Sequence, residues 1–202
     1  MKILKKINKG LILTIIVLVA LTIYLVGVEK QRKADKEVIK NKCEEFVELT
    51  NKYLIYPESM QILAEPITES KKEEYTNQMK TELEKIMIKN DEAVKIQYEF
   101  LKSMLENNNT KEEMRTKVDR KITKISSYEF DGNQVTVTFN SKLEIDSKYL
   151  NGEEEKTRKN SYETSGEEIT LQKIDNEWKV VSSNLRYYGN NYYTVDSDMM
   201  VY

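Results

Sequence analysis

The sequence predicts an α+β protein in which an N-terminal transmembrane helix precedes helices packed on a curved four-stranded antiparallel meander. Three observations predict this class. Residues 11–28 contain no charged side chain. Apolar residues then recur at intervals of three and four, the period of one helical face. From residue 121 apolar and polar residues alternate, as in half-buried strands, and turn signals divide that stretch.

The segment LILTIIVLVALTIYLVGV, residues 11–28, predicts the transmembrane helix. As a helix it would be roughly 27 Å long, close to the hydrocarbon thickness of a bilayer. A buried core helix is one alternative, but the segment has no polar stripe to face water. A cleaved signal peptide is the other, but the apolar run is long and no small-residue cleavage site follows it. We therefore expect an uncleaved anchor in the lipid bilayer.

Basic residues on both sides of this segment bear on its orientation. Four lysines precede it and four basic residues follow closely, so the positive-inside rule is nearly balanced. A short basic stretch before a first apolar segment usually stays inside. We expect a single-pass protein of the cytoplasmic membrane with its N-terminus in the cytoplasm. The expected parts are a cytoplasmic tail (1–10), the transmembrane helix (11–28), a charged helical stalk (29–37), an extracytoplasmic α+β domain (38–195) and a tail (196–202).

The composition excludes several classes of chemistry. Among 202 residues there is one Cys and no His, and 32 basic residues nearly balance 34 acidic ones. A single Cys excludes an internal disulfide, and the lack of His excludes Ser-His-Asp and Cys-His catalysis. The acidic side chains show no metal-ligand spacing. A near-neutral chain is not a dedicated nucleic-acid binder. We expect no cofactor, no metal and no nucleic-acid partner.

Helical periodicity continues through residues 30–105. Residues 30–56 predict one helix that ends before Pro57, and residues 57–70 predict a connection or short helix. One face of the first helix carries Ile39, Cys43, Phe46, Thr50 and Tyr53.

Capping signals divide the helical region further. Ser70 with Glu73 forms a capping box that predicts the start of the next helix. Asn90-Asp91 predicts a break, and Asn107-Asn108-Asn109 predicts the end of the helical region. Thr110 with Glu113 forms a second capping box, which predicts a short helix through Val118.

Three turn signals divide the C-terminal half into four strands. They are Asp131-Gly132, Asn151-Gly152 and Asp175-Asn176, and the strands they predict cover 121–130, 133–150, 153–174 and 177–188.

Regular pairing from the second turn would point Ile169 away from Val135 and Val137. We therefore predict a β-bulge near Gly166 that brings Ile169 opposite Val135. The last hairpin should pair Val180 with Leu171 and Trp178 with Lys173. One apolar face would then hold Val135, Val137, Phe139, Ile169, Leu171, Trp178 and Val180.

The order of elements, the Asp131-Gly132 hairpin before VTVTF and the closing strand EWKVV resemble the nuclear transport factor 2-like superfamily. This resemblance covers about residues 38–188 and implies a cystatin-like cone of helices in a curved sheet. The superfamily includes enzymes, ligand binders and scaffolds, so the fold alone does not select a function. With its anchor, the architecture is also similar to single-pass assembly proteins of bacterial type IV secretion and conjugation machines, which implies a structural role.

Several side chains invite a catalytic interpretation. Cys43 lies on an apolar helix face, and we expect a buried small hydrophobe there. Tyr75, Tyr128 and Tyr162 could point inward, where a tyrosine more often packs with a satisfied hydroxyl than catalyses.

The segment LRYYGNNYY, residues 185–193, is the candidate partner surface. Tyrosine gives a large contact area at little cost in entropy. The residues proposed to carry the surface are Arg186, Tyr187, Tyr188, Tyr192 and Tyr193. Its partner would be another protein, a second copy of the chain or a cell-wall polymer. The alternative is a last hairpin that packs on its own domain.

The sequence thus predicts a non-catalytic extracytoplasmic domain for assembly or partner binding, with a secretion or conjugation apparatus as one setting. A small-ligand or sensor domain that uses the pocket of the cone is the alternative, and an enzyme is the third reading.

Overall fold

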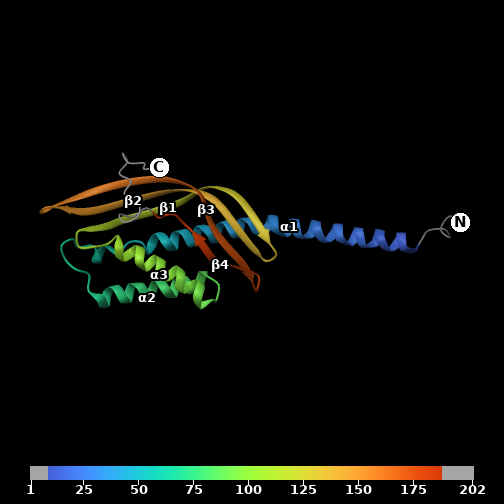
Figure 1. Ribbon diagram of the computed structural model, residues 1–202, viewed down its shortest axis with the longest axis horizontal. Helices are drawn as coiled ribbons and strands as arrows, with labels where there is room; N and C mark the ends of the chain where they lie inside the picture. The colour runs from blue at the N-terminus through green and yellow to red at the C-terminus, as the bar shows by residue number, and fades with distance from the viewer. Residues whose placement is uncertain (1–8, 188–202) are drawn as a thin grey trace. The chain divides into compact units, whose positions relative to one another are not determined.

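The structure, a computed structural model, describes residues 9–187 and confirms the α+β class (Figure 1). Four strands form one antiparallel meander in the order β1-β2-β3-β4. The described chain divides between Lys40 and Asn41 into two compact units, which are described separately. The elements are α1 (Lys9–Lys52), the 3-10 helix η2 (Glu58–Met60), α2 (Glu69–Ile86), α3 (Asp91–Asn107), β1 (Glu113–Asp131), β2 (Gln134–Asn151), β3 (Glu154–Ile174) and β4 (Glu177–Asn184).

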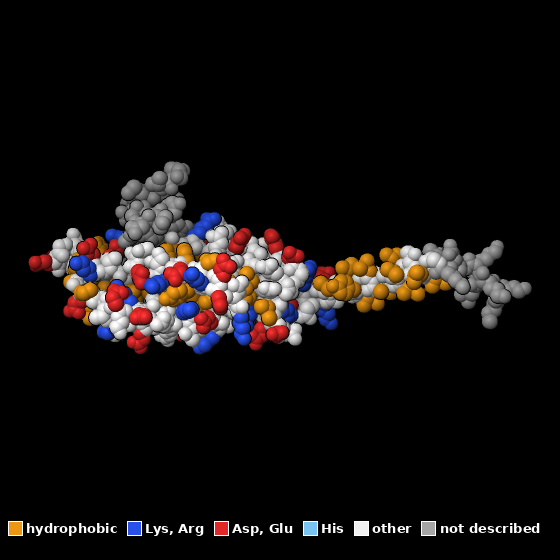
Figure 2. All heavy atoms as spheres, turned by 60° about the horizontal axis from the view of Figure 1, so that its bottom comes forward, with side chains coloured by type: hydrophobic (Ala, Val, Ile, Leu, Met, Phe, Trp, Pro, Cys, Tyr) orange, Lys and Arg blue, Asp and Glu red, His pale blue; other side chains and the backbone are white. Residues whose placement is uncertain are grey.

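The first unit contains the apolar part of α1. Its large hydrophobic side chains are exposed, for example Leu13 at 64% and Ile23 at 68%. They form the band of hydrophobic side chains along the N-terminal helix in Figure 2. Within the described residues, this is the one helix long and apolar enough to cross a membrane. The helix continues without a break to Lys52, so the predicted span and the predicted helix after it are one element.

The second unit packs helices against one face of the sheet, which curves over α2 and α3 (Figure 1). The backbone N–H of Ile88, just after α2, donates to the Val180 carbonyl of β4 at 2.8 Å, which fixes the end of α2 to the sheet. The predicted apolar face is confirmed, because all seven of its side chains are buried: Val135, Val137, Phe139, Ile169, Leu171, Trp178 and Val180.

The predicted bulge in β3 is confirmed. Phe139 pairs with Glu167 but Ser141 pairs with Thr164, so β3 carries one extra residue here, and Gly166 has φ +69°. The pairs Val180–Leu171 and Trp178–Lys173 are also as predicted.

The predicted partner of Ile169 is wrong, since it pairs with Val137 instead of Val135. The reason is the β2–β3 turn. Asn151 pairs with Glu154, so the turn residues are Gly152-Glu153, one position later than predicted. This moves the register by two residues, which leaves each side chain on its predicted face.

The second capping box does not start a helix. The Thr110 hydroxyl does accept from the backbone N–H groups of Glu112 and Glu113, at 3.2 and 3.1 Å. However, β1 begins at Glu113 and pairs with the far end of β2, which extends to Asn151. The ladder satisfies the backbone of residues 113–120, so a long strand replaces the predicted short helix and starts before residue 121.

The first capping box is also wrong. α2 begins at Glu69 with Thr68 at its N-cap, and no side chain caps it. The predicted break at Asn90 is confirmed, because the Asn90 side chain accepts from the N–H groups of Glu92 and Ala93 and caps α3. α3 ends at Asn107, as the run of three asparagines predicts.

Gly166→Ala tests the bulge. A Cβ at this position meets nothing within 4 Å, so the cost is backbone strain alone, about 1–2 kcal/mol for a left-handed residue. We expect the free energy of unfolding, measured with urea on the full chain in detergent, to fall by that amount. Ser165→Ala, at the exposed neighbour, is the control and should leave it nearly unchanged. Equal stability of the two variants would contradict the strain.

Candidate functional site

The predicted partner surface is described only in part. Arg186 and Tyr187 follow β4, whereas Tyr188, Tyr192 and Tyr193 lie outside the described residues. β4 ends at Asn184 and not at the predicted residue 188, because the next residues leave the ladder and contact side chains of the sheet.

A buried ion pair lies beneath these residues. Nη1 of Arg120 on β1 lies 2.6 Å from Oε1 of Glu167 on β3, and both side chains are fully buried. Ser141 on β2 donates to the other carboxylate oxygen of Glu167, and its hydroxyl lies 2.8 Å from that of Thr164. Buried charges need such partners, since an unpaired one costs several kcal/mol.

The same ion pair holds the chain after β4. The backbone N–H of Arg186 donates to Glu167 Oε1 at 2.8 Å, and the Arg120 guanidinium donates to the Arg186 carbonyl. The Tyr187 ring lies over that guanidinium, with 4.3 Å from its centroid to Arg120 Cζ. We call Arg120, Glu167, Arg186 and Tyr187 the C-terminal clamp. It fixes the path of the chain where the tyrosine-rich segment begins.

Tyr187 packs against its own domain. Its ring is half-buried, its centroid lies 5.7 Å from that of Phe100 on α3, and its hydroxyl is buried. Burial raises the pKa of Tyr187 above its ordinary value. The Arg186 side chain, by contrast, is exposed. In the described part of the surface, Tyr187 is therefore a structural contact and Arg186 is available to a partner.

Sequence reasoning missed the clamp. Arg120 and Glu167 are 47 residues apart and lie on strands that do not pair with each other. The available signal was their position. Side chains two residues apart in a strand share a face, so Arg120 lies on the same face as buried Val118. For the same reason Glu167, which follows the bulge, lies on the face of Ile169. Both side chains were therefore expected to point toward the core.

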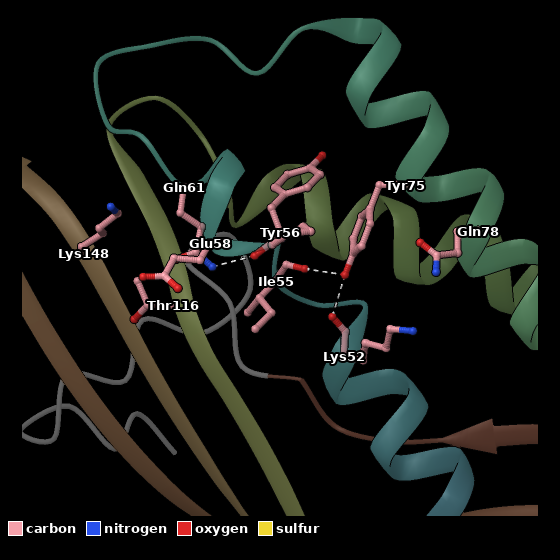
Figure 3. A pocket seen from close by; sticks show the side chains of 10 residues that line it. Lys52, Ile55, Tyr56, Glu58, Gln61, Tyr75, Gln78, Thr116 and Lys148 are labelled. Carbon is pink, nitrogen blue, oxygen red and sulfur yellow. Dashed lines mark hydrogen bonds between the residues drawn. The ribbon is translucent and has the colours of Figure 1, made fainter.

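A hollow of about 680 Å³ lies between the end of α1, the loop after it, α2, the start of β1 and the end of β2 (Figure 3). The Tyr75 hydroxyl donates to the carbonyls of Lys52 and Ile55, both at 2.9 Å, which fixes one wall. The remaining lining is mostly polar: Tyr56, Pro57, Glu58, Gln61, Gln78, Thr116 and Lys148.

An ion pair and burial limit the chemistry that the side chains around this hollow can perform. Lys52 donates to Glu82 at 2.8 Å, and this hydrogen bond lowers the pKa of Glu82. Burial, with Glu106 nearby, raises the pKa of Tyr56 to about 12, and its hydroxyl has no hydrogen-bond partner among the described residues. A hydroxyl with that pKa is a neutral donor at pH 7. The hollow can thus offer hydrogen bonds and the Lys148 charge to a polar ligand.

Of the other candidate side chains, Cys43 and Tyr75 are buried in the core. Cys43 is fully buried, and burial raises the pKa of its thiol to about 12, as expected of a small hydrophobe. Tyr75 has the satisfied hydroxyl that was predicted, while Tyr128 and Tyr162 are half-buried. Across residues 9–187, no three Cys, Asp or Glu side chains come together as metal ligands would.

The chain matches no protein-family model, and no curated protein or solved structure is significantly similar to it. The resemblance to the nuclear transport factor 2-like superfamily therefore stays a prediction based on the order of elements.

Glu167→Ala tests the clamp. It leaves the Arg120 charge buried without its carboxylate, so we expect the free energy of unfolding to fall by about 3–5 kcal/mol. The matched control is Glu69→Ala, which removes a carboxylate bonded to Lys72 on the surface and should cost less than about 0.5 kcal/mol. Urea unfolding of the full chain in detergent measures both. Equal losses in the two variants would contradict the clamp.

The reactivity of Cys43 gives a second test. Only the thiolate reacts with alkylating reagents, and a pKa of about 12 keeps the thiol protonated at pH 8. We expect iodoacetamide to label the folded protein far more slowly than the protein in urea, as followed by mass spectrometry. Labelling at equal rates would show that the site is open.

Proposed function

We propose that this protein is a membrane-anchored scaffold, in which residues 11–28 cross the cytoplasmic membrane and the α+β domain binds partners on the outer side. The observation that carries the proposal is the packing of the domain. Large apolar side chains, together with the buried Arg120–Glu167 ion pair, fill the space between the helices and the sheet, so the natural binding surface is the outside of the domain.

The buried side chains support this point directly. Phe46 and Tyr53 from α1, Met79 and Leu83 from α2, and Phe139 from β2 have no exposed area. Ligand binders and enzymes with a cone fold keep a polar cavity at this place, whereas a filled interior favours a structural role.

We also propose that the N-terminus lies in the cytoplasm and the α+β domain outside. The exposed apolar side chains of α1 need a lipid environment, and the lysines before residue 11 favour the cytoplasm. The outside of the domain mixes acidic and basic side chains, as one face shows in Figure 2. Such a surface suits a specific protein partner or a second copy better than a polyanion such as nucleic acid.

Assembly within a secretion or conjugation machine is the setting that we propose. One span, a short cytoplasmic segment and an outer α+β domain are similar to assembly proteins of type IV systems. The tyrosine-rich segment that begins at the C-terminal clamp would be the contact surface, through Arg186 and the tyrosines after Tyr187.

A second candidate function is binding of a small polar ligand. The hollow of about 680 Å³ favours it, because Lys148 contributes a positive charge to its lining and Gln78 and Thr116 contribute polar groups. Isothermal titration with small carboxylates and sugars, on wild-type protein and on Lys148→Ala, tests this candidate. Binding lost in the variant would support it.

Protease access tests the orientation. In intact spheroplasts, added trypsin should digest the domain carried by residues 41–202, which is rich in lysine, and leave a fragment with the membrane helix. An antibody against each end follows the products. A domain that is digested only after lysis would contradict the proposal.

Substitution of the tyrosine-rich segment tests the partner surface. Tyr188, Tyr192 and Tyr193 are changed together to Ser, while Tyr187 is kept because it packs in the clamp. We expect at least about tenfold less partner captured after cross-linking in cells, since interface tyrosines often contribute over 1 kcal/mol each. Tyr98→Ser on α3 is the control, with unfolding temperature compared throughout. Unchanged capture would contradict this surface.

A further inference from the structure

Helix α3 carries apolar side chains on two faces. One face is buried in the core of the domain. On the other, Ile96 is 65% exposed and Phe100 is 43% exposed, while Ala93 and Met104 are half-buried. These four residues, at intervals of three and four, share one side of the helix, and we call them the α3 stripe. Single exposed apolar residues are ordinary on a protein surface, but a row at helical spacing is typical of a face that packs on another element.

A row of carboxylates borders the stripe. Glu92, Glu99 and Glu106 are exposed and lie seven residues apart, so they share one side of α3, and we call them the acidic row. Two of them stand four residues before and three residues after Ile96, at neighbouring positions on the helix surface. Within residues 9–187, no lysine or arginine forms an ion pair with any of the three.

The opposite border of the stripe is occupied by the protein itself. The Ser183 hydroxyl of β4 donates to Oε1 of Gln97 at 3.0 Å. The Tyr187 ring packs on Phe100, with 5.7 Å between the ring centroids. A helix that lies on the stripe therefore has its free flank over the acidic row.

We propose that the α3 stripe and the acidic row together form a docking site for a basic amphipathic helix of another protein. Apolar residues of that helix would pack on Ile96 and Phe100, and lysines or arginines on its flank would pair with the row. This site adds a second contact to the scaffold and does not depend on the tyrosine-rich segment.

The charges favour this occupant over two others. Two copies of α3 packed antiparallel on their stripes would bring one acidic row against the other, because like positions face each other in such a pair. An anionic membrane surface would be repelled by the same row. A basic helix is the occupant that both the apolar stripe and the carboxylates attract.

Peptide binding tests the site. The full chain is held in nanodiscs of zwitterionic lipid, and empty nanodiscs give the background. The probe is a fluorescent helical peptide as long as α3, with Leu at the a and d heptad positions and Lys at e and g, and its match carries Glu in place of Lys. We expect the Lys peptide to bind at least about tenfold more tightly in fluorescence anisotropy, and the difference to shrink at high salt.

Two variants separate the apolar from the charged contribution. Ile96→Ser removes apolar contact area and should weaken binding of both peptides about tenfold, while Phe100 is kept because it packs on Tyr187. Replacement of all three glutamates of the acidic row by Gln should abolish the preference for the Lys peptide. The tyrosine-rich segment is intact in both variants, so their failure would leave the scaffold proposal standing.

The controls match each change elsewhere on the surface. Ile62→Ser alters an apolar residue that is 51% exposed in the loop after α1. The charge control replaces three exposed glutamates of β3 by Gln: Glu155, Glu163 and Glu168. Both controls should bind the peptides as the wild type does, with unfolding temperatures compared throughout.

Three results would overturn the proposal. Equal binding of the two peptides would show that the row does not select charge, and binding of neither would show that the stripe is not a docking site. A preference for the Lys peptide that survives in the Gln variant would show that the peptide follows the charge of the whole protein.

A cysteine beside the stripe tests the second copy. Ser103 is exposed, and Cys43 can stay because it is fully buried. We expect Ser103→Cys to form no disulfide between chains under mild oxidation. A disulfide-linked dimer that Ile96→Ser removes would overturn the proposal in favour of a second copy.

Cross-linking in cells tests the natural partner. A photoreactive residue replaces Ile96, and the cross-linked peptide is sequenced by mass spectrometry. We expect a segment with apolar residues at helical spacing and an excess of Lys and Arg. A segment with an excess of Asp and Glu, a segment of the same chain or a lipid adduct would overturn the proposal.

Discussion

One extra residue in β3 decides which way half of that strand faces. Before the bulge the inward positions of β3 are even-numbered, as with buried Thr164, and after it they are odd-numbered, as with Glu167, Ile169 and Leu171. A strand without the bulge would turn Ile169 and Leu171 to solvent, because side chains alternate strictly along a strand. The helices would then face polar side chains over that part of the sheet. The packing of the second unit depends on this change of parity at Gly166.

The bulge also brings an acidic side chain into the core. It turns Glu167 inward beside Ser141, where Arg120 from the edge strand reaches it. An ion pair in such a place contributes little net stability compared with apolar packing, but it specifies geometry. Here it accepts and donates the backbone hydrogen bonds that the ladder no longer supplies to Arg186. The end of β4 and the course of residues 185–187 are consequences of that pairing.

The sequence predicted the features that depend on short-range pattern. Alternation along residues 135–145, the turn dipeptides and the reversed parity at Ile169 sufficed for four strands and the bulge. It failed where long-range pairing overrides a local signal. Thr110 makes the hydrogen bonds of a cap, yet residues 113–120 are a strand because β2 is long enough to pair with them. The clamp escaped prediction for a similar reason, since only the folded sheet brings Arg120 to Glu167.

The burial of Cys43 has a consequence for how the protein matures. An oxidant can reach this sulfur only while the chain is still unfolded, and closure of the helices over the sheet then ends that exposure. Rapid folding therefore protects newly made chains from covalent, misassembled dimers. A mutation that delays folding would lengthen that vulnerable interval even if the finished protein were equally stable.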